Sequence, residues 1–299
     1  MPDALRKTVS ATEAPALLGV SPYLTKWMLY RRFHDRGDID PPEDARMTWG
    51  KRLEPLIMEQ AAHDLKMEII RNDDGTGKQA YHRRGVLGCS RDAIVICPDR
   101  GPGTLETKCV FEYGTWMRDW GGGTHAPKHY EIQLQQQCYV GDGEGTDPYR
   151  WGVIAAWVAG EVHYFERHPI RELWAGLEAA AKNFLDDVAH DREPDPFGAP
   201  IEIPLLSRLE RRQEIADLTD RADLADAARV LDGASASKSA IEKMQTDAKA
   251  RLLAAAGQAD ELLLPDGIRV KIKQQSRGAY EVKPTTFVTV KAYVPESAK

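Results

Sequence analysis

The chain has 299 residues, of which 42% are hydrophobic and 29% are charged. This composition is typical of soluble globular proteins and excludes collagen, a mostly disordered chain and a membrane bundle. The formal net charge of −6 excludes a uniformly basic nucleic-acid binder, but it permits an acidic protein with a local basic groove. The first residues lack the apolar segment of a signal peptide, so we expect a cytoplasmic protein.

The first two thirds of the chain mix helix and strand signals. Apolar residues spaced three and four apart predict amphipathic helices, and a Gln-rich stretch without Gly or Pro, 129–140, predicts another helix. Short β-branched or apolar runs predict strands. Two of these strands form a hairpin whose turn, Pro98–Gly103, spans about six residues. The predicted helices are 14–33 (with a turn inside), 49–65, 129–140 and 170–190, and the predicted strands are 88–97, 104–111, 151–158 and 162–167. We therefore expect an α/β core with a central mixed sheet flanked by helices.

After a Pro-rich linker the character of the sequence changes. A helix-rich segment with a predicted break at Asp232–Ser235 suggests an antiparallel helical hairpin. The tail that follows has strand-like alternation and is locally basic. Three domains are predicted: 1–198, 205–260 and 261–299. The hairpin carries no catalytic pattern, and an oligomer contact, a guide for DNA ends and a partner-docking site remain alternatives for it.

The predicted hairpin brings a set of charged residues together. Side chains two apart on a strand point to the same side, so Glu106 and Lys108 project together while Thr107 faces away. Because the hairpin reverses the chain, Asp92 lies beside Glu106. Two carboxylates suit Mg²⁺, which binds oxygen ligands and leaves room for phosphate and water. Lys108 would orient or deprotonate the attacking water, or stabilise the developing charge.

Two further residues can join this set. Glu54 on the helix over 49–65 could add a third carboxylate, and Gln133 on the helix over 129–140 could fix a water or a ligand. Taken alone, the spacing of Asp92, Glu106 and Lys108 is a weak signal, because such triples arise by chance. An ordinary surface ion pair on a hairpin explains the triple better.

Several sequence blocks in a fixed order are far more specific than the triple. They are Val9–Glu13 with Leu18–Tyr23, Trp49–Glu54, Gly88–Asp92, Leu105–Cys109 and Tyr130–Gln135. Over about residues 8–190 the chain resembles the YqaJ-type viral recombinase family, whose best-known relative is lambda phage exonuclease. This family belongs to the PD-(D/E)XK nucleases, so the resemblance implies a restriction-endonuclease-like core.

The resemblance also implies an activity. Relatives are Mg²⁺-dependent exonucleases, with Mn²⁺ as a substitute, that digest double-stranded DNA ends 5′→3′ and leave 3′ overhangs for a single-strand annealing protein. They act as rings of subunits that enclose DNA, here by analogy a trimer, and would be phage- or prophage-encoded. The alternatives are a structure-specific endonuclease of the same superfamily, or a DNA-binding scaffold with an inactive core.

Residue roles follow from the same resemblance. Asp92, Glu106 and the main-chain carbonyl of Thr107 would bind the metal, and Lys108 would be the catalytic lysine. Glu54 matches the acidic residue of the upstream helix. The remaining matches are Gln133, with the active-site glutamine, and Thr12, Ser90 and Arg6 or Lys7, with groups that bind the terminal 5′-phosphate.

Two departures from the family pattern stand out. The usual Ser-Pro-Asp-Gly is replaced by residues 90–93, in which Arg91 follows Ser90; Arg91 could contact phosphate, or it could be a tolerated surface change. The usual Gly-Gly-Ser-Asp is replaced by Ser10–Glu13, which leaves the phosphate pocket open to question.

Other chemically distinctive residues are assigned less demanding roles. Trp116 and Trp120, beside Gly121–Gly123, either contact DNA or pack in the core. We expect His63, His125 and His129 to be structural or exposed. None of the cysteines Cys89, Cys97, Cys109 and Cys138 has C-x-x-C spacing, so we expect reduced thiols and no iron–sulfur cluster.

Overall fold

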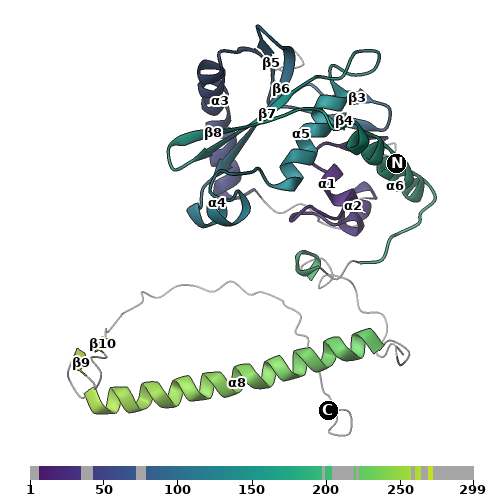
Figure 1. Cartoon of the computed structure of the whole chain (residues 1–299). Helices are drawn as coiled ribbons and strands as arrows, with labels where there is room; N and C mark the ends of the chain where they lie inside the picture. Colours follow the sequence, from purple (N-terminus) through teal and green to yellow (C-terminus); the bar gives the residue numbers. More distant parts are fainter. Residues whose placement is uncertain are drawn as a thin grey trace. The chain divides into compact units, whose positions relative to one another are not determined.

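The computed structural model describes residues 7–34, 43–71, 79–196, 199–203, 219, 222–256, 260–263 and 269–271. The chain divides into two compact units, Met1–Arg208 and Leu209–Lys299. The first unit holds two of the three β-sheets and six α-helices of the described residues, together with a short 3-10 helix at Pro200–Glu202 (Figure 1).

A five-stranded mixed sheet forms the centre of the first unit. Its strands lie in the order β2-β5-β6-β7-β8; β6 and β7 run parallel, and all other neighbours are antiparallel. The strands are β2 (Glu68–Arg71), β5 (Ala93–Cys97), β6 (Gly101–Val110), β7 (Gly152–Val158) and β8 (Glu161–Arg167). Nearly every residue of β7 is buried, because helices cover both faces of the sheet.

Helices α3 and α5 cover opposite faces of this sheet (Figure 1). Ile57 and Ala61 of α3 pack against β5, β6 and β7, whereas Leu134 of α5 packs on the other side against Ile154 and Ala156. The helices of the unit are α1 (Ala14–Leu17), α2 (Lys26–Phe33), α3 (Ala45–Leu65), α4 (Tyr113–Asp119), α5 (Lys128–Val140) and α6 (Arg171–Ala189). The predicted mixed α/β core is thus confirmed.

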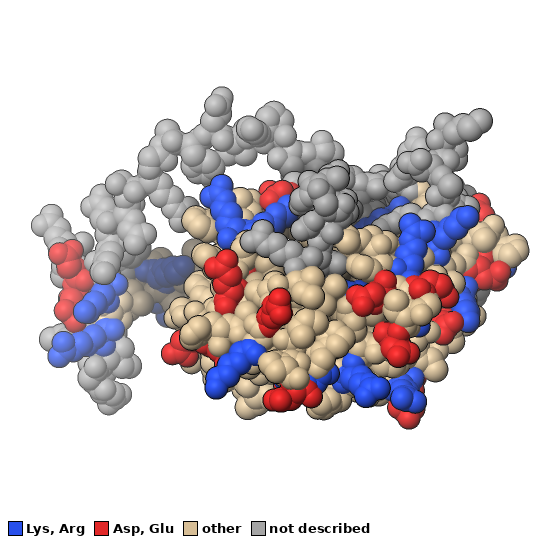
Figure 2. Space-filling model, turned by 90° about the horizontal axis from the view of Figure 1, so that it is seen from above, with Lys and Arg blue, Asp and Glu red and all other residues tan. Residues whose placement is uncertain are grey.

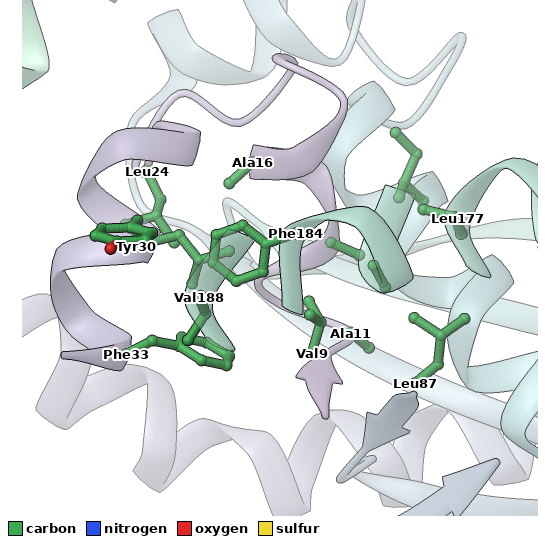
Figure 3. Close-up of a cluster of buried hydrophobic side chains, with 14 of the residues drawn as sticks. Val9, Ala11, Ala16, Leu24, Tyr30, Phe33, Leu87, Leu177, Phe184 and Val188 are labelled. Atoms are coloured by element: carbon green, nitrogen blue, oxygen red, sulfur yellow. The ribbon is translucent and has the colours of Figure 1, made fainter. Parts of the chain in front are cut away.

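A second, three-stranded sheet lies beside α5. It has the order β1-β4-β3, with β1 (Val9–Ser10) parallel to β4 (Leu87–Cys89) and β3 (His82–Arg84) antiparallel to β4. Its apolar side chains continue into the core formed by α1, α2 and α6, where Phe33 and Phe184 meet edge to face with ring centroids 5.2 Å apart (Figure 3).

The structure corrects two sequence predictions in this unit. The predicted strand 88–97 is two strands in different sheets, β4 and β5, separated at residues 90–92. The turn after β5 is also shorter than predicted, because Cys97 pairs with Gly101. Pro102 and Gly103 therefore belong to β6, where the tryptophan ring of Trp151 occupies the space next to Gly103.

The second unit contains α8 (Ala222–Ala256), with β9 (Glu261–Leu263) paired antiparallel to β10 (Arg269–Lys271). Helix α8 runs without interruption through Asp232–Ser235, so the predicted break there is wrong. One glycine costs a helix only about 1 kcal/mol relative to alanine, and the surrounding alanines are strong helix formers. The predicted first arm of the hairpin falls mainly outside the described residues. Within the described part of the chain, none of the helices is long and apolar enough to cross a membrane.

Candidate active site

Strand β6 carries the first two members of the site. Glu106 and Lys108 project from the same side of the strand and form a direct ion pair between Lys108 Nζ and Glu106 Oε1. The Glu106 side chain is 5% exposed and that of Lys108 is 19% exposed. The pair is therefore not the solvated surface pair that the spacing alone favoured, because both charges are largely withdrawn from water.

Asp92 joins this pair directly before β5 begins. Ladder pairing between β5 and β6 stops at Ala93 and Leu105, and the carboxylate of Asp92 then takes over. Asp92 Oδ2 accepts hydrogen bonds from the backbone N–H of Thr107 at 2.7 Å and from its hydroxyl at 2.8 Å. The Thr107 hydroxyl thus also contacts Asp92, although we expected that side chain to face away from Glu106 and Lys108.

This contact also fixes the direction of a carbonyl. The N–H and C=O groups of one strand residue point toward the same neighbouring strand. Since the N–H of Thr107 points to Asp92, its carbonyl oxygen points to the same open edge. The backbone oxygen that the family resemblance assigned to the metal therefore faces the Asp92 side of β6.

Glu54 approaches from α3. The side-chain amide of Gln79 lies between Glu54 and Asp92, with Nε2 at 3.3 Å from Glu54 Oε1 and 3.4 Å from Asp92 Oδ1. Sequence reasoning did not identify Gln79, which precedes β3 outside every recognised block. Its amide hydrogens carry partial positive charge between two carboxylates, which is the kind of place a cation would occupy.

Helix α5 holds the carboxylate of Glu106 from the opposite direction. Gln133 Nε2 donates to Glu106 Oε1 at 2.7 Å, and Gln137 Nε2 donates to Glu106 Oε2 at 2.6 Å. Gln133, predicted to fix a water or a ligand, thus holds a carboxylate of the site in this structure. Gln137 was missed, although its spacing of four residues from Gln133 places both amides on one helix face.

The electrostatics of the site reflect an excess of negative charge. Burial, and then the charges of Glu106 and Glu54, raise the pKa of Asp92 to about 7 despite the opposing effect of Lys108. Burial and Glu106 also raise the pKa of Glu54. Burial alone would lower the pKa of Lys108, but Glu106 and Asp92 outweigh it and the pKa is raised. The lysine is therefore an ammonium at neutral pH.

The donors at the site fit a hard divalent cation. Glu54, Asp92 and Glu106 supply three carboxylates against one ammonium, and carboxylate and carbonyl oxygens are the ligands Mg²⁺ prefers. No three His, Cys, Asp or Glu side chains in the described ranges form a complete metal cluster by themselves. The fit therefore rests on two carboxylates with a backbone oxygen, leaving positions for water and phosphate.

The two residues whose hydroxyls are predicted to bind phosphate follow the same end of the small sheet. Strands β1 and β4 are parallel, with Ser10 opposite Gly88, so Thr12 and Ser90 both follow the same end of this strand pair. Both residues are exposed, and Ser10 Oγ lies 3.1 Å from Thr12 Oγ1. Arg6 lies outside the described residues.

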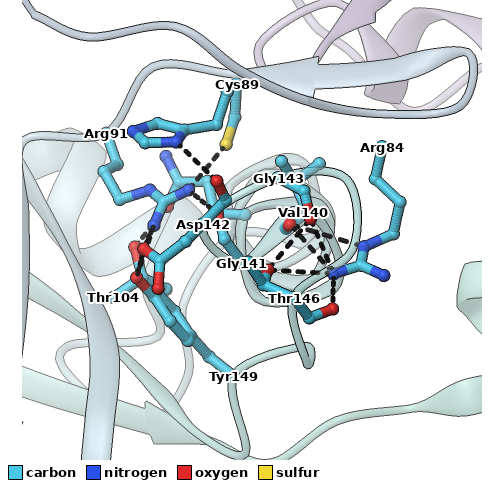
Figure 4. A network of polar contacts seen from close by, with 12 residues as sticks. Arg84, Cys89, Arg91, Thr104, Val140, Gly141, Asp142, Gly143, Thr146 and Tyr149 are labelled. Atoms are coloured by element: carbon cyan, nitrogen blue, oxygen red, sulfur yellow. Dashed lines mark hydrogen bonds and ion pairs between the residues drawn. The ribbon is translucent and has the colours of Figure 1, made fainter.

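Arg91 is neither a phosphate contact nor a surface residue. It is 1% exposed, and its guanidinium donates to Tyr149 Oη at 2.9 Å and to the carbonyl of Gly141. Figure 4 shows Arg91 and Arg84 on either side of the 141–146 turn, where Arg84 donates to the carbonyls of Gly143 and Thr146. Arg91 thus holds the loop behind Asp92, and the sequence could not reveal this because the acceptors are some fifty residues away.

We expect Arg91→Met to lower the free energy of unfolding by about 2–3 kcal/mol, since it leaves buried acceptors without donors. Arg91→Lys should also destabilise, because an ammonium cannot reproduce the planar fork that serves several acceptors. Thermal unfolding of the full-length variants measures the effect. Arg150→Met, at an exposed position nearby, is the control. If Arg91→Met and Arg150→Met have the same melting temperature, this role of Arg91 is contradicted.

The remaining candidates are structural. Trp116 and Trp120 are buried and stack on each other with centroids 5.6 Å apart, so packing, not DNA contact, explains them. The cysteines form no disulfide, and three of the four are buried. Acidic and basic side chains are interspersed over the face in Figure 2.

Several solved structures resemble this chain at low identity. LHK-Exo, an alkaline exonuclease from Laribacter hongkongensis, is 18% identical, with 63% of this chain and 91% of that chain covered and a TM-score of 0.46. The structure of LHK-Exo in complex with dAMP is 16% identical, with the same coverage of both chains and a TM-score of 0.48. A phage-related exonuclease from Haemophilus somnus 129PT is 13% identical, with 62% of this chain and 96% of that chain covered and a TM-score of 0.47.

A comparison with curated proteins found no match. A family model does match: that of the YqaJ-like viral recombinase domain, over residues 3–145. The matched range contains all the residues that meet at Glu106, namely Glu54, Asp92, Lys108, Gln133 and Gln137. The family predicted from the sequence blocks is therefore confirmed over this range. Residues 3–145 are a YqaJ-like viral recombinase domain.

Proposed function

We propose that the protein is a Mg²⁺-dependent exonuclease that digests one strand from double-stranded DNA ends, 5′→3′, and leaves 3′ single strands for an annealing protein. One observation carries the proposal: Asp92, directly before β5, meets Glu106 and Lys108 of β6, and Glu54 joins them from α3. Such a set of acids and an amine suits hydrolysis of a phosphodiester, because it can hold a cation and still neutralise the developing charge.

Each residue has a separate task in this proposal. Asp92, Glu106 and the carbonyl of Thr107 would hold Mg²⁺, which when bound polarises the phosphoryl group and lowers the pKa of water. Glu54 adds negative charge from α3. Lys108, as an ammonium, donates to the attacking water or to the phosphate oxygen on which charge develops, rather than accepting a proton.

The DNA end would lie between this site and the end of the small sheet. Thr12 and Ser90 offer exposed hydroxyls for a terminal 5′-phosphate, with Arg6 or Lys7 as a cationic partner. A ring of subunits, by analogy a trimer, would keep the enzyme on its DNA between cleavage steps. The proposed setting is the cytoplasm of a bacterium that carries the phage or prophage.

The decisive experiment compares linear duplexes with 5′-phosphate or 5′-hydroxyl ends and a closed-circular duplex, each with and without Mg²⁺. We expect Mg²⁺-dependent release of nucleotides from linear DNA, faster with 5′-phosphate, and no cutting of circles. Cleavage of circles would indicate an endonuclease instead. If purified protein degrades none of these substrates with Mg²⁺ or Mn²⁺, the proposed activity is wrong.

A further inference from the structure

Lys108 is held on two sides. Its ammonium forms the ion pair with Glu106, and Nζ also lies 4.7 Å from the ring centroid of Tyr130. A cation above an aromatic face is attracted by the ring quadrupole. The ammonium is therefore confined between a carboxylate and an aromatic ring.

Helix α5 contacts both partners of the ion pair. Tyr130 and Gln133 are three residues apart, so they lie on one face of the helix. Tyr130 contacts Lys108, while Gln133 donates to Glu106. A single turn of helix thus sets where the ammonium and its carboxylate lie.

Tyr130 is itself fixed by rings rather than by its hydroxyl. Its ring centroid lies 4.0 Å from that of His129 and 5.6 Å from that of Trp120. Among the described residues, its hydroxyl has one hydrogen-bond partner, Tyr23, at a long distance of 3.5 Å. Burial and the charge of Lys108 lower the pKa of His129 to about 4, so the neighbouring imidazole adds no competing positive charge.

We propose that Tyr130 is a positioning residue, which holds the Lys108 ammonium toward the reacting phosphate through the face of its ring. This inference rests on the proposed nuclease function. Lysine has a flexible stem and three rotatable donors, so the ion pair with Glu106 alone leaves the ammonium free to turn. The ring closes one side, and the N–H donors then point to Glu106 and to the open side of the site.

The test compares full-length Tyr130→Phe and Tyr130→Leu on linear duplex DNA with Mg²⁺. A cation–π contact of this size predicts that Tyr130→Leu lowers kcat about tenfold with KM for DNA unchanged, whereas Tyr130→Phe stays within about twofold of the wild type. Tyr139→Leu is the matched control: it lies on the same helix, is also partly buried and has the Arg84 guanidinium over its ring, but it does not contact Lys108.

A shape-conserving substitution separates positioning from folding. Trifluorophenylalanine at position 130 keeps the ring but weakens its quadrupole, so its kcat should fall below that of Tyr130→Phe at equal melting temperature. Equal kcat for these two variants, or wild-type kcat for Tyr130→Leu, would overturn the inference. Inactivity of the wild-type protein would instead contradict the proposed function itself.

Discussion

Lys108→Ala should reduce the rate of DNA cleavage by about a thousandfold while DNA binding persists. Removing one preorganised donor to a developing negative charge costs catalysis about 10²–10³-fold, and Lys108 is the one ammonium among the carboxylates of Glu54, Asp92 and Glu106 in the described site. Binding should survive because many contacts along the duplex share it. Single-turnover digestion measures the first effect, and a gel shift in Ca²⁺ measures the second.

The control for this experiment is Lys182→Ala, which removes a lysine that is 59% exposed on α6 and pairs with Glu178. It should digest DNA at the wild-type rate. If Lys108→Ala also does so, the assignment of the site is wrong. If it loses DNA binding as well, Lys108 contributes to substrate affinity rather than to the chemical step.

Asp92→Asn should abolish activity, weaken metal binding at least tenfold and yet stabilise the metal-free fold. The charge of a proposed ligand is lost, whereas the remaining amide oxygen can still accept from the N–H of Thr107. Calorimetry with Ca²⁺ measures the affinity. A loss of at least tenfold is expected because removing even a residue that only hydrogen-bonds to a metal ligand lowers metal affinity about 10–100-fold. Thermal unfolding without metal should show a gain of about 3–6 °C.

The stability gain depends on pH, and its sign follows from the pKa of Asp92. Folding raises this pKa from 3.8 to about 7, so the folded state binds the proton more tightly than the unfolded state. The loss of wild-type folding stability caused by ionising Asp92 is absent below about pH 4, grows as the pH rises, and is complete above about pH 7. Asp92→Asn should therefore stabilise more at pH 8 than at pH 5.

Protonation of Asp92 should also weaken the binding of a metal ion. Because the cation competes with a proton on Asp92, the Ca²⁺ affinity of the wild-type protein should fall as the pH drops below about 7. Asp99→Asn, in the exposed turn between β5 and β6, is the control and should alter neither affinity nor melting temperature. A Ca²⁺ affinity of Asp92→Asn equal to that of the wild type would remove Asp92 from the proposed ligands.

The sequence sufficed to predict those parts of the site that local geometry determines. Strand alternation places Glu106 and Lys108 on one side, and hairpin reversal brings Asp92 to them. Helical spacing identified α3 and α6. In each case a periodic pattern and its neighbours along the chain contain the information, so no distant contact had to be known.

Predictions failed where a distant contact decides the outcome. Arg91 was predicted to contact phosphate or to be a surface change, but it is buried, and acceptors at Gly141 and Tyr149 compensate its burial. Gln79 and Gln137 were not identified because their partners lie across the fold. The break predicted in α8 failed for a local reason: one glycine among alanines is too weak a signal to end a helix.

Helix α5 uses its glutamines as connectors to separate parts of the unit. Gln136 donates to the carbonyls of Val9 and Gly88 in the small sheet, Gln135 accepts from the backbone of Ile170, and Gln133 and Gln137 hold Glu106. Deleting one residue early in α5 would rotate every later side chain by about 100° and break all these connections at once. Length changes in this chain are therefore far less tolerable in α5 than point substitutions, and an engineered variant must preserve the register of that helix first.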